Sequence, residues 1–151
     1  MYDNILIPTD GSETSQKALD HALELADRYN ATIHTLYVID LEAVDIGLGT
    51  EQVQRIKEGR YKEMDEIRKR VESATGEIAK QASERGIECI EGARAGRPHA
   101  SINDYATDND IDVIVMASHG RSGVRRMLLG SVTEKVIRVS DVPVLVVKVN
   151  D

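Results

Sequence analysis

Short apolar runs alternate with amphipathic stretches along this chain. The runs are rich in β-branched residues and shorter than ordinary helices, which predicts strands buried in a sheet. We place these strands at Asn4–Ile7, Thr32–Ile39, Ile87–Ala93, Val113–Met116 and Val144–Val147. In the stretches between them apolar residues recur every three or four positions, which predicts helices. The helices cover Ser12–Tyr29, Gln52–Arg85, Pro98–Asn109 and Ser131–Val139.

This alternation predicts one doubly wound α/β domain over residues 1–151, with a five-stranded parallel sheet flanked by about four helices. The strands are parallel because each returns through a right-handed crossover. Asn30 and Gly86 are expected to end the first and second helices. Gly59 and Gly76 fall inside the long second helix, the first near its start and the second as a tolerated weak point.

The stretch Asp112–Ser131 organises the candidate chemistry. Its apolar strand is followed by small and polar residues, a basic glycine-containing loop, and a Ser131-x-x-Glu134 spacing that predicts a capping box at a helix start. A strand, a glycine loop and a helix N-terminus together bind phosphate, because backbone N–H groups and the helix dipole face the anion. The Walker A and GxGxxG motifs are absent, so backbone amides and the Ser131 hydroxyl would hold the phosphate.

In an open parallel sheet, ligands bind beyond the carboxyl ends of the strands. Three segments lie there, and with Gly130-Ser131 they could line one site. They are Pro8-Thr9-Asp10, Val38-Ile39-Asp40 and Ala117–Gly120.

Composition excludes several classes of protein. A formal net charge of −7 and the absence of Phe and Trp argue against a nucleic-acid binder. No apolar segment is long enough to cross a membrane, so we expect no membrane partner. The single cysteine, Cys89, is predicted to be a buried, inert thiol and fits a cytoplasmic location.

Each candidate residue also has a purely structural explanation. Asp10 could stabilise the turn before the first helix, and Ser131 could be a simple helix cap. Arg121 could steer phosphates or lie on a solvent-facing loop. Asp10, Ser118 and His119 would suggest a hydrolase triad, but the nucleophile motif GxSxG is absent, which disfavours it.

Several motifs together resemble the universal stress protein family over essentially the whole chain. They are Pro8-Thr9-Asp10-Gly11-Ser12, Tyr37-Val38-Ile39-Asp40, Gly96-Arg97-Pro98, Ser118-His119-Gly120, Gly130-Ser131-Val132 and Pro143–Val147. The nucleotide-binding branch of that family carries Gly-x-x-Gly, nine residues, then Gly followed by Ser or Thr. Gly120 and Gly130-Ser131 fit this pattern, whereas Ala117 replaces the first glycine.

The resemblance implies an adenine near Val38 and Ile39, a ribose or adenine beside Asp10, and phosphates at Gly120 and Gly130–Val132. By analogy with this fold the strand order is 3-2-1-4-5. The full predicted nucleotide-binding set is Pro8, Thr9, Asp10, Val38, Ile39, Ala117, His119, Gly120, Arg121, Gly130, Ser131 and Val132.

We therefore expect a cytoplasmic universal stress protein that binds ATP, ADP or AMP, with Mg²⁺ bridging the phosphates, as a switch or binding module in stress response. The apolar C-terminal strand, Val144–Val149, lies at a sheet edge and predicts a homodimer. One alternative, favoured by Ala117, is an interaction protein of the same fold that binds no nucleotide. Another is an ATP-using enzyme, but only Asp10 and His119 could act as acid or base, so at most a slow ATPase is expected.

Overall fold

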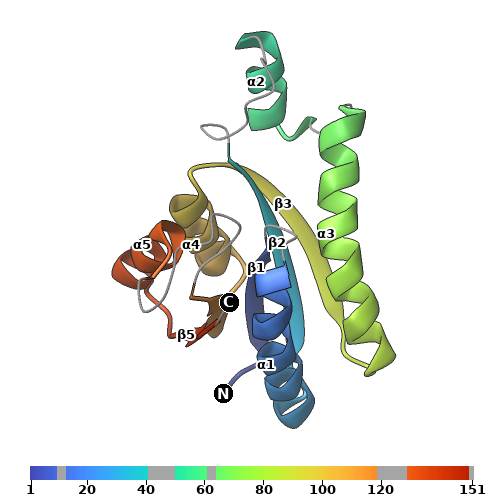
Figure 1. Ribbon diagram of the computed structural model, residues 1–151, viewed down its shortest axis with the longest axis vertical. Coiled ribbons are helices and arrows are strands. Elements are labelled where there is room, and N and C mark those ends of the chain that lie inside the picture. Colours follow the sequence, from blue (N-terminus) through green and yellow to red (C-terminus); the bar gives the residue numbers. More distant parts are fainter. Residues whose placement is uncertain (10–12, 41–49, 61–63, 119–128, 150–151) are drawn as a thin grey trace.

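The computed structural model describes residues 1–9, 13–40, 50–60, 64–118 and 129–149. Its elements, in chain order, are β1 (Asn4–Thr9), α1 (Glu13–Tyr29), β2 (Thr32–Asp40), α2 (Thr50–Lys57), α3 (Asp65–Glu84), β3 (Cys89–Gly96), α4 (Pro98–Asp108), β4 (Val113–Ala117), α5 (Ser131–Val139) and β5 (Val144–Val147). The strands form one parallel sheet in the order β3-β2-β1-β4-β5 (Figure 1). The predicted α/β class and strand order are confirmed.

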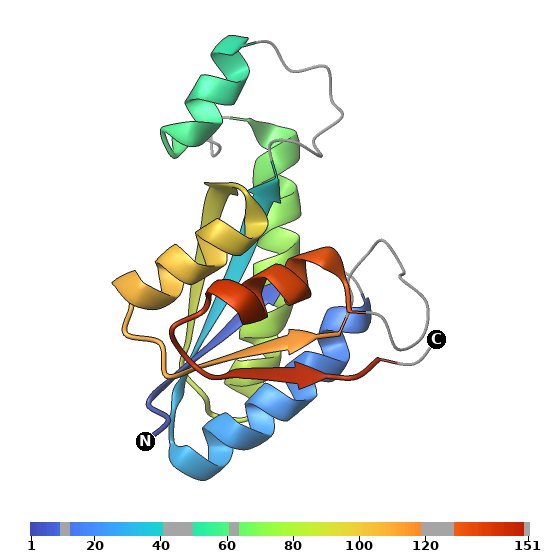
Figure 2. The ribbon, with the colours of Figure 1, turned by 90° about the vertical axis from the view of Figure 1, so that its left-hand side faces the viewer.

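Helices cover both faces of the sheet, with α1 and α3 on one side and α4 and α5 on the other (Figures 1 and 2). Side chains of a strand alternate between the two faces. Ile5 and Ile7 therefore pack with Leu19 of α1 and Ile78 of α3, whereas Leu6 packs against the α4–α5 layer. Burial on both faces explains why β1 is a continuous apolar run. No helix in the described ranges combines the length and the apolar character needed to cross a membrane.

Three helices end in the same way before a strand begins. A residue with positive φ follows each helix, and the next N–H bonds back to a carbonyl five residues earlier, as in a Schellman motif. These positive-φ residues are Asn30 (φ 54°), Gly86 (φ 69°) and Asp110 (φ 52°). The N–H of the residue that follows each donates to the carbonyl of Ala26, Ala82 or Ala106. The predicted helix ends at Asn30 and Gly86 are confirmed.

The predicted single helix Gln52–Arg85 is wrong, because α2 and α3 are separate helices and the described part of the chain has five helices. Gly59, just after α2, has φ +80°, a left-handed conformation that no α-helix can contain. Ile56 of α2 and Ile67 of α3 both pack with Ile39 in a small core at the carboxyl end of β2. Burying both helices there requires a bend that the three- and four-residue periodicity does not reveal. Gly76 is tolerated inside α3, as expected.

Cys89 begins β3 and is partly buried beneath α3 and α1. Burial, with a smaller effect of Glu91, raises the pKa of its thiol to about 11. The thiol therefore stays protonated at neutral pH and is a poor nucleophile, as predicted.

A buried polar cluster joins β2 to α4. The hydroxyl of Tyr105 lies 2.8 Å from Nδ1 of His34, and Oδ1 of Asn4 lies 3.1 Å from its Nε2. Because the amide nitrogen of Asn4 donates to the Asp110 carbonyl, its oxygen faces His34 and accepts from Nε2–H. In the neutral imidazole, Nδ1 then accepts from the Tyr105 hydroxyl, so this form satisfies both bonds.

This cluster predicts pH-dependent stability. Burial lowers the pKa of His34 although Glu88 opposes the shift, so the unfolded chain binds the proton more tightly than the folded one. The stabilisation is complete above the unfolded pKa of about 6.5 and is lost as the pH falls below it. In urea unfolding at pH 7.5 and 5.5, His34→Gln should lose less stability than the wild type, whereas exposed His21→Gln should behave like the wild type. Equal losses in all three proteins would contradict this role.

Candidate functional site

The site lies where the chain crosses to opposite faces after the neighbouring strands β1 and β4. The β1–β2 ladder runs to Thr9↔Tyr37, but the β1–β4 ladder of the described residues ends at Leu6↔Ile114. The Asp3 carbonyl accepts from Thr32 N–H at the start of β2, and the Asn4 carbonyl accepts from Asp112 N–H just before β4. The backbone groups of even-numbered β1 residues therefore point toward β4. Pro8 is the next of these and has no N–H, which explains why the ladder stops.

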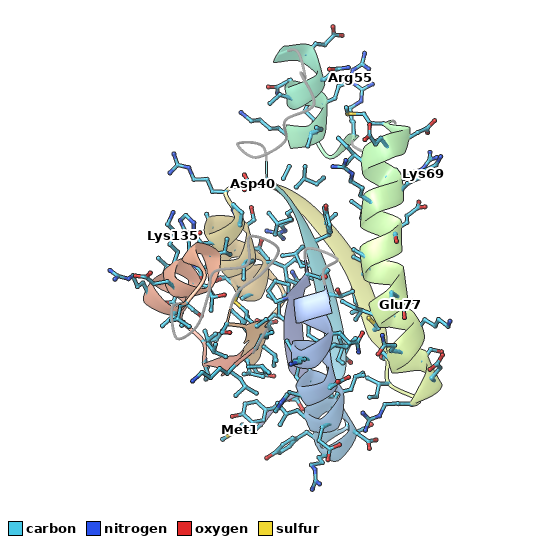
Figure 3. All side chains as sticks on the ribbon, in the orientation of Figure 1. Met1, Asp40, Arg55, Lys69, Glu77 and Lys135 are labelled. Carbon is cyan, nitrogen blue, oxygen red and sulfur yellow. The ribbon has the colours of Figure 1, made fainter. Side chains whose placement is uncertain are left out.

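The end of β2 projects beyond β1. Its pairing with β3 continues to Asp40↔Gly96, whereas its last β1 partner among the described residues is opposite Tyr37. Thr32 N–H bonds toward β1, so by alternation the backbone groups of Val38 also point to that side. Asp40 lies at this end of the sheet, below α2 (Figure 3). We call Val38–Asp40 the β2 ledge.

The ledge offers a ligand different groups at successive residues. The Ile39 side chain packs with Ile56 and Ile67 beneath α2 and α3, and its backbone is paired with Ala95 of β3. Val38 points to the other face, where it is partly buried against the α4–α5 core. Thr9 at the end of β1 is buried beside the ledge.

Helix α5 begins with an open N-terminus. The predicted capping box is wrong: Gly130 is the N-cap, Ser131 is the first helical residue, and no side chain caps the helix. Gly130 takes the cap position because its N–H is tied to Ser118 O at 2.7 Å and its carbonyl accepts from Glu134 N–H at 2.9 Å. Within the described ranges, the N–H groups of Ser131, Val132 and Thr133 have no hydrogen-bond partner. Three donors at a helix start form an anion-binding arrangement.

Two hydrogen bonds fix this open turn to the end of β4. One is the Gly130 N–H to Ser118 O bond, and the other joins Thr133 Oγ1 to Ala117 O at 2.9 Å. Thr133 is only 4% exposed, so its bond is shielded from water. Sequence analysis missed Thr133 because its partner is sixteen residues away and no motif marks the pair.

Ser118 uses its polar groups in structural bonds. Its N–H donates to Val147 O at 2.8 Å, and its hydroxyl accepts from Val149 N–H at 3.0 Å. A side chain engaged in this way is poorly placed to be a nucleophile. The hydroxyl therefore counts further against a hydrolase triad.

The described members of the predicted set, Pro8, Thr9, Val38, Ile39, Ala117, Gly130, Ser131 and Val132, all lie at the carboxyl ends of β1, β2 and β4 or at the start of α5. Asp10, His119, Gly120 and Arg121 lie outside the described residues. In the described part of the chain no group of three or more His, Cys, Asp or Glu side chains could hold a metal ion. The groups available for binding are thus mainly backbone N–H and C=O groups.

Fold and site define a doubly wound α/β domain with an open helix N-terminus where its crossovers diverge. A model of the universal stress protein family matches residues 1–148. The chain belongs to the universal stress protein family.

Two relatives come from Methanocaldococcus jannaschii. Universal stress protein MJ0531 is 36% identical over 149 residues, covering 98% of this chain and 83% of that protein. Universal stress protein MJ0577 is 35% identical over 159 residues, covering 98% and 96%. The solved structure of MJ0577 superimposes with a TM-score of 0.80, covering 100% of this chain and 99% of that one.

Two more distant structures show the shared fold and were solved with nucleotides. A universal stress protein in complex with cAMP has a TM-score of 0.66 at 22% identity, with 97% of each chain covered. An Arabidopsis thaliana family protein with AMP bound has a TM-score of 0.67 at 19% identity, with 98% and 92% covered.

The tie between Thr133 and β4 makes a testable contribution to stability. Thr133→Val keeps the shape of the side chain but leaves the Ala117 carbonyl without this donor, so we expect a loss of about 1 kcal/mol in the free energy of unfolding. Thr107→Val is the matched control, because the Thr107 hydroxyl also donates to a backbone carbonyl but is exposed. Its effect should stay within about 0.5 kcal/mol. The free energy of unfolding is measured in urea. Similar losses in both variants would show that the buried Thr133 bond contributes no more to stability than the exposed Thr107 bond.

Proposed function

We propose that this protein binds an adenine nucleotide, ATP foremost or else ADP or AMP, between the β2 ledge and the N-terminus of α5. The observation that carries the proposal is the set of N–H donors of Ser131, Val132 and Thr133, beside the end of β4, which have no partner among the described residues. These donors lie at the positive end of the α5 helix dipole, which favours the negative charge of a phosphate chain. The family members solved with cAMP and AMP support this class of ligand.

The conformation of Gly130 supports close approach of a phosphate. Its φ of −62° and ψ of 152° are open to any residue, so the backbone does not require glycine there. In this proposal, the missing Cβ instead allows a phosphate to come close to the helix N-terminus. Ala117, Gly120, Arg121 and His119 complete the proposed phosphate side, and Mg²⁺ would be held by the phosphates themselves.

The β2 ledge suits the base. Adenine has an exocyclic amine that donates and ring nitrogens that accept, so backbone groups such as those of Val38 can recognise it without a charged side chain. Pro8, Thr9 and Asp10 would border the ribose, and Ile39 would lie next to Val38 on the β2 ledge. The nucleotide then spans the sheet from β2 to β4, across the end of β1.

We assign the protein the role of a nucleotide-dependent switch or binding module in a cytoplasmic stress response. The phosphate side of the site consists mainly of backbone N–H groups, and in the sequence only Asp10 and His119 are candidates for an acid or base near the phosphates. Turnover beyond a slow ATPase activity is therefore not expected.

A homodimer through β5 is part of the proposal. This strand is at the edge of the sheet, and its residue Leu145 is 38% exposed. The carbonyls of Pro143 and Val147 bond toward β4, so the backbone groups of Val144 and Val146 point outward. Antiparallel pairing of two such edges about a two-fold axis would satisfy those groups and cover Leu145.

A second candidate is an interaction protein that uses this edge and binds no nucleotide. Ile137 and Val139 on α5 are exposed apolar residues, as is Leu145 on β5, and Ala117 adds a Cβ where the nucleotide-binding branch has glycine. The two candidates differ in one observable, the ligand that is carried through purification. The protein should be purified without added nucleotide and denatured, and the supernatant analysed by mass spectrometry. Adenine nucleotide at near-stoichiometric amounts supports our proposal, and a ligand-free protein that also ignores added ATP supports the second candidate.

Gly130→Val tests the phosphate position. The new side chain would obstruct the approach of phosphate to the α5 donors, and losing such charge-assisted bonds should weaken ATP binding by about 2 kcal/mol or more. Adenosine, which has no phosphate, should lose much less affinity. Calorimetric titration of the folded variant with both ligands measures the difference. Unchanged ATP affinity would place the phosphates elsewhere.

Val146→Pro tests the dimer. Proline removes an outward-facing N–H and leaves the β4 bonds of Pro143 and Val147 in place, so the dimer should dissociate while the domain stays folded. Val146→Ala keeps the N–H and is the control. Light scattering at tens of micromolar should give a dimer mass for the wild type and the alanine variant and a monomer mass for the proline variant. A monomeric wild type would refute the assembly.

A further inference from the structure

Ser118 is the residue at which three separate segments meet. Its carbonyl accepts from Gly130 N–H at the start of α5, and its N–H donates to Val147 O at the end of β5. Its hydroxyl accepts from Val149 N–H, just after β5. Ser118 and Val149 are both buried, so these bonds are shielded from water.

The two sides of Ser118 are mechanically connected. The carbonyl that holds Gly130 belongs to the same short residue whose hydroxyl holds Val149, and a buried serine has little freedom to move one group alone. If the residues after β5 detach, Ser118 loses a bond that restrains it. The Ser118 carbonyl, which accepts from Gly130 N–H, is then held less rigidly. Because Gly130 is the N-cap, the direction of the open α5 donors is fixed less well.

We propose that Ser118 is a positioning residue that couples the order of the chain after β5 to the affinity of the α5 N-terminus for nucleotide. This inference rests on the proposed nucleotide site and names a regulation of it. Anything that holds Val149 in place, including pairing along the β5 edge, tightens nucleotide binding. Because coupling between two equilibria is reciprocal, bound nucleotide in turn holds Val149 in place by the same factor.

The structure supplies a matched pair of serines for the test. Ser140 lies before β5, and its hydroxyl accepts from Val142 N–H at 3.1 Å and donates to Val142 O at 2.8 Å. Ser118→Ala and Ser140→Ala thus each remove a bond from a backbone N–H to a serine hydroxyl, at opposite ends of β5. We expect Ser118→Ala to weaken ATP binding about fivefold, the equivalent of one ordinary hydrogen bond, and Ser140→Ala to leave it unchanged.

A second variant removes the other partner of the same hydrogen bond. Val149→Pro removes the donor and leaves Ser118 intact. It should weaken ATP binding to a similar extent, and the double variant should be no weaker than either single one, because both substitutions remove the same bond between Val149 N–H and the Ser118 hydroxyl. Additive effects would show that the two residues act separately and would overturn the proposal.

Amide hydrogen exchange gives a readout that a merely structural role would not move. ATP should slow exchange of the Val149 N–H in the wild type by the factor that separates the ATP affinities of wild type and Ser118→Ala. In Ser118→Ala that amide should exchange quickly with or without ATP. If the wild type binds ATP but Val149 exchange does not respond and Ser118→Ala binds equally well, the coupling is wrong while the nucleotide site stands. If the wild type binds no ATP, the proposed function itself fails.

Discussion

The enclosure of β1 is the constraint on which the rest of the structure depends. Its side chains at Ile5, Leu6 and Ile7 are fully buried between two helix layers, and its edges are paired with β2 and β4. A strand enclosed on both faces and both edges must be apolar and must find all its partners within the sheet. Pro8 ends one of these ladders, and the proposed site begins where that pairing ceases.

The candidate site is built largely from backbone groups. The first turn of α5 presents N–H donors, and the β2 ledge presents the backbone of Val38. Backbone recognition tolerates many side chains, which explains why the relevant sequence pattern consists of small residues at set intervals. Precision comes from the supports behind those groups, namely Thr133 bonded to Ala117 and Gly130 bonded to Ser118.

Prediction from the sequence was most successful where one physical cause dominates. Short apolar runs located the five strands of the described chain, and the αL preference of Asn and Gly marked the helix ends at Asn30 and Gly86. It failed where two causes compete. The three- and four-residue period continues across Gly59, but packing of α2 and α3 on Ile39 requires a break there. The Ser131-x-x-Glu134 pattern suggested a cap, yet the bond from Gly130 to Ser118 moves the helix start by one residue.

By itself the sequence determined the α/β class, the apolar strands, and the glycine and serine positions typical of the universal stress protein family, because these depend on local propensity and periodicity. Only the tertiary structure decided three features. Pro8 ends the pairing of β1 with β4, the Ile39 side chain packs against α2 and α3, and Ser118 joins α5 to the residues after β5. Those bonds connect residues far apart in the chain. Their partners are chosen by how the layers pack around β1, which no local pattern encodes.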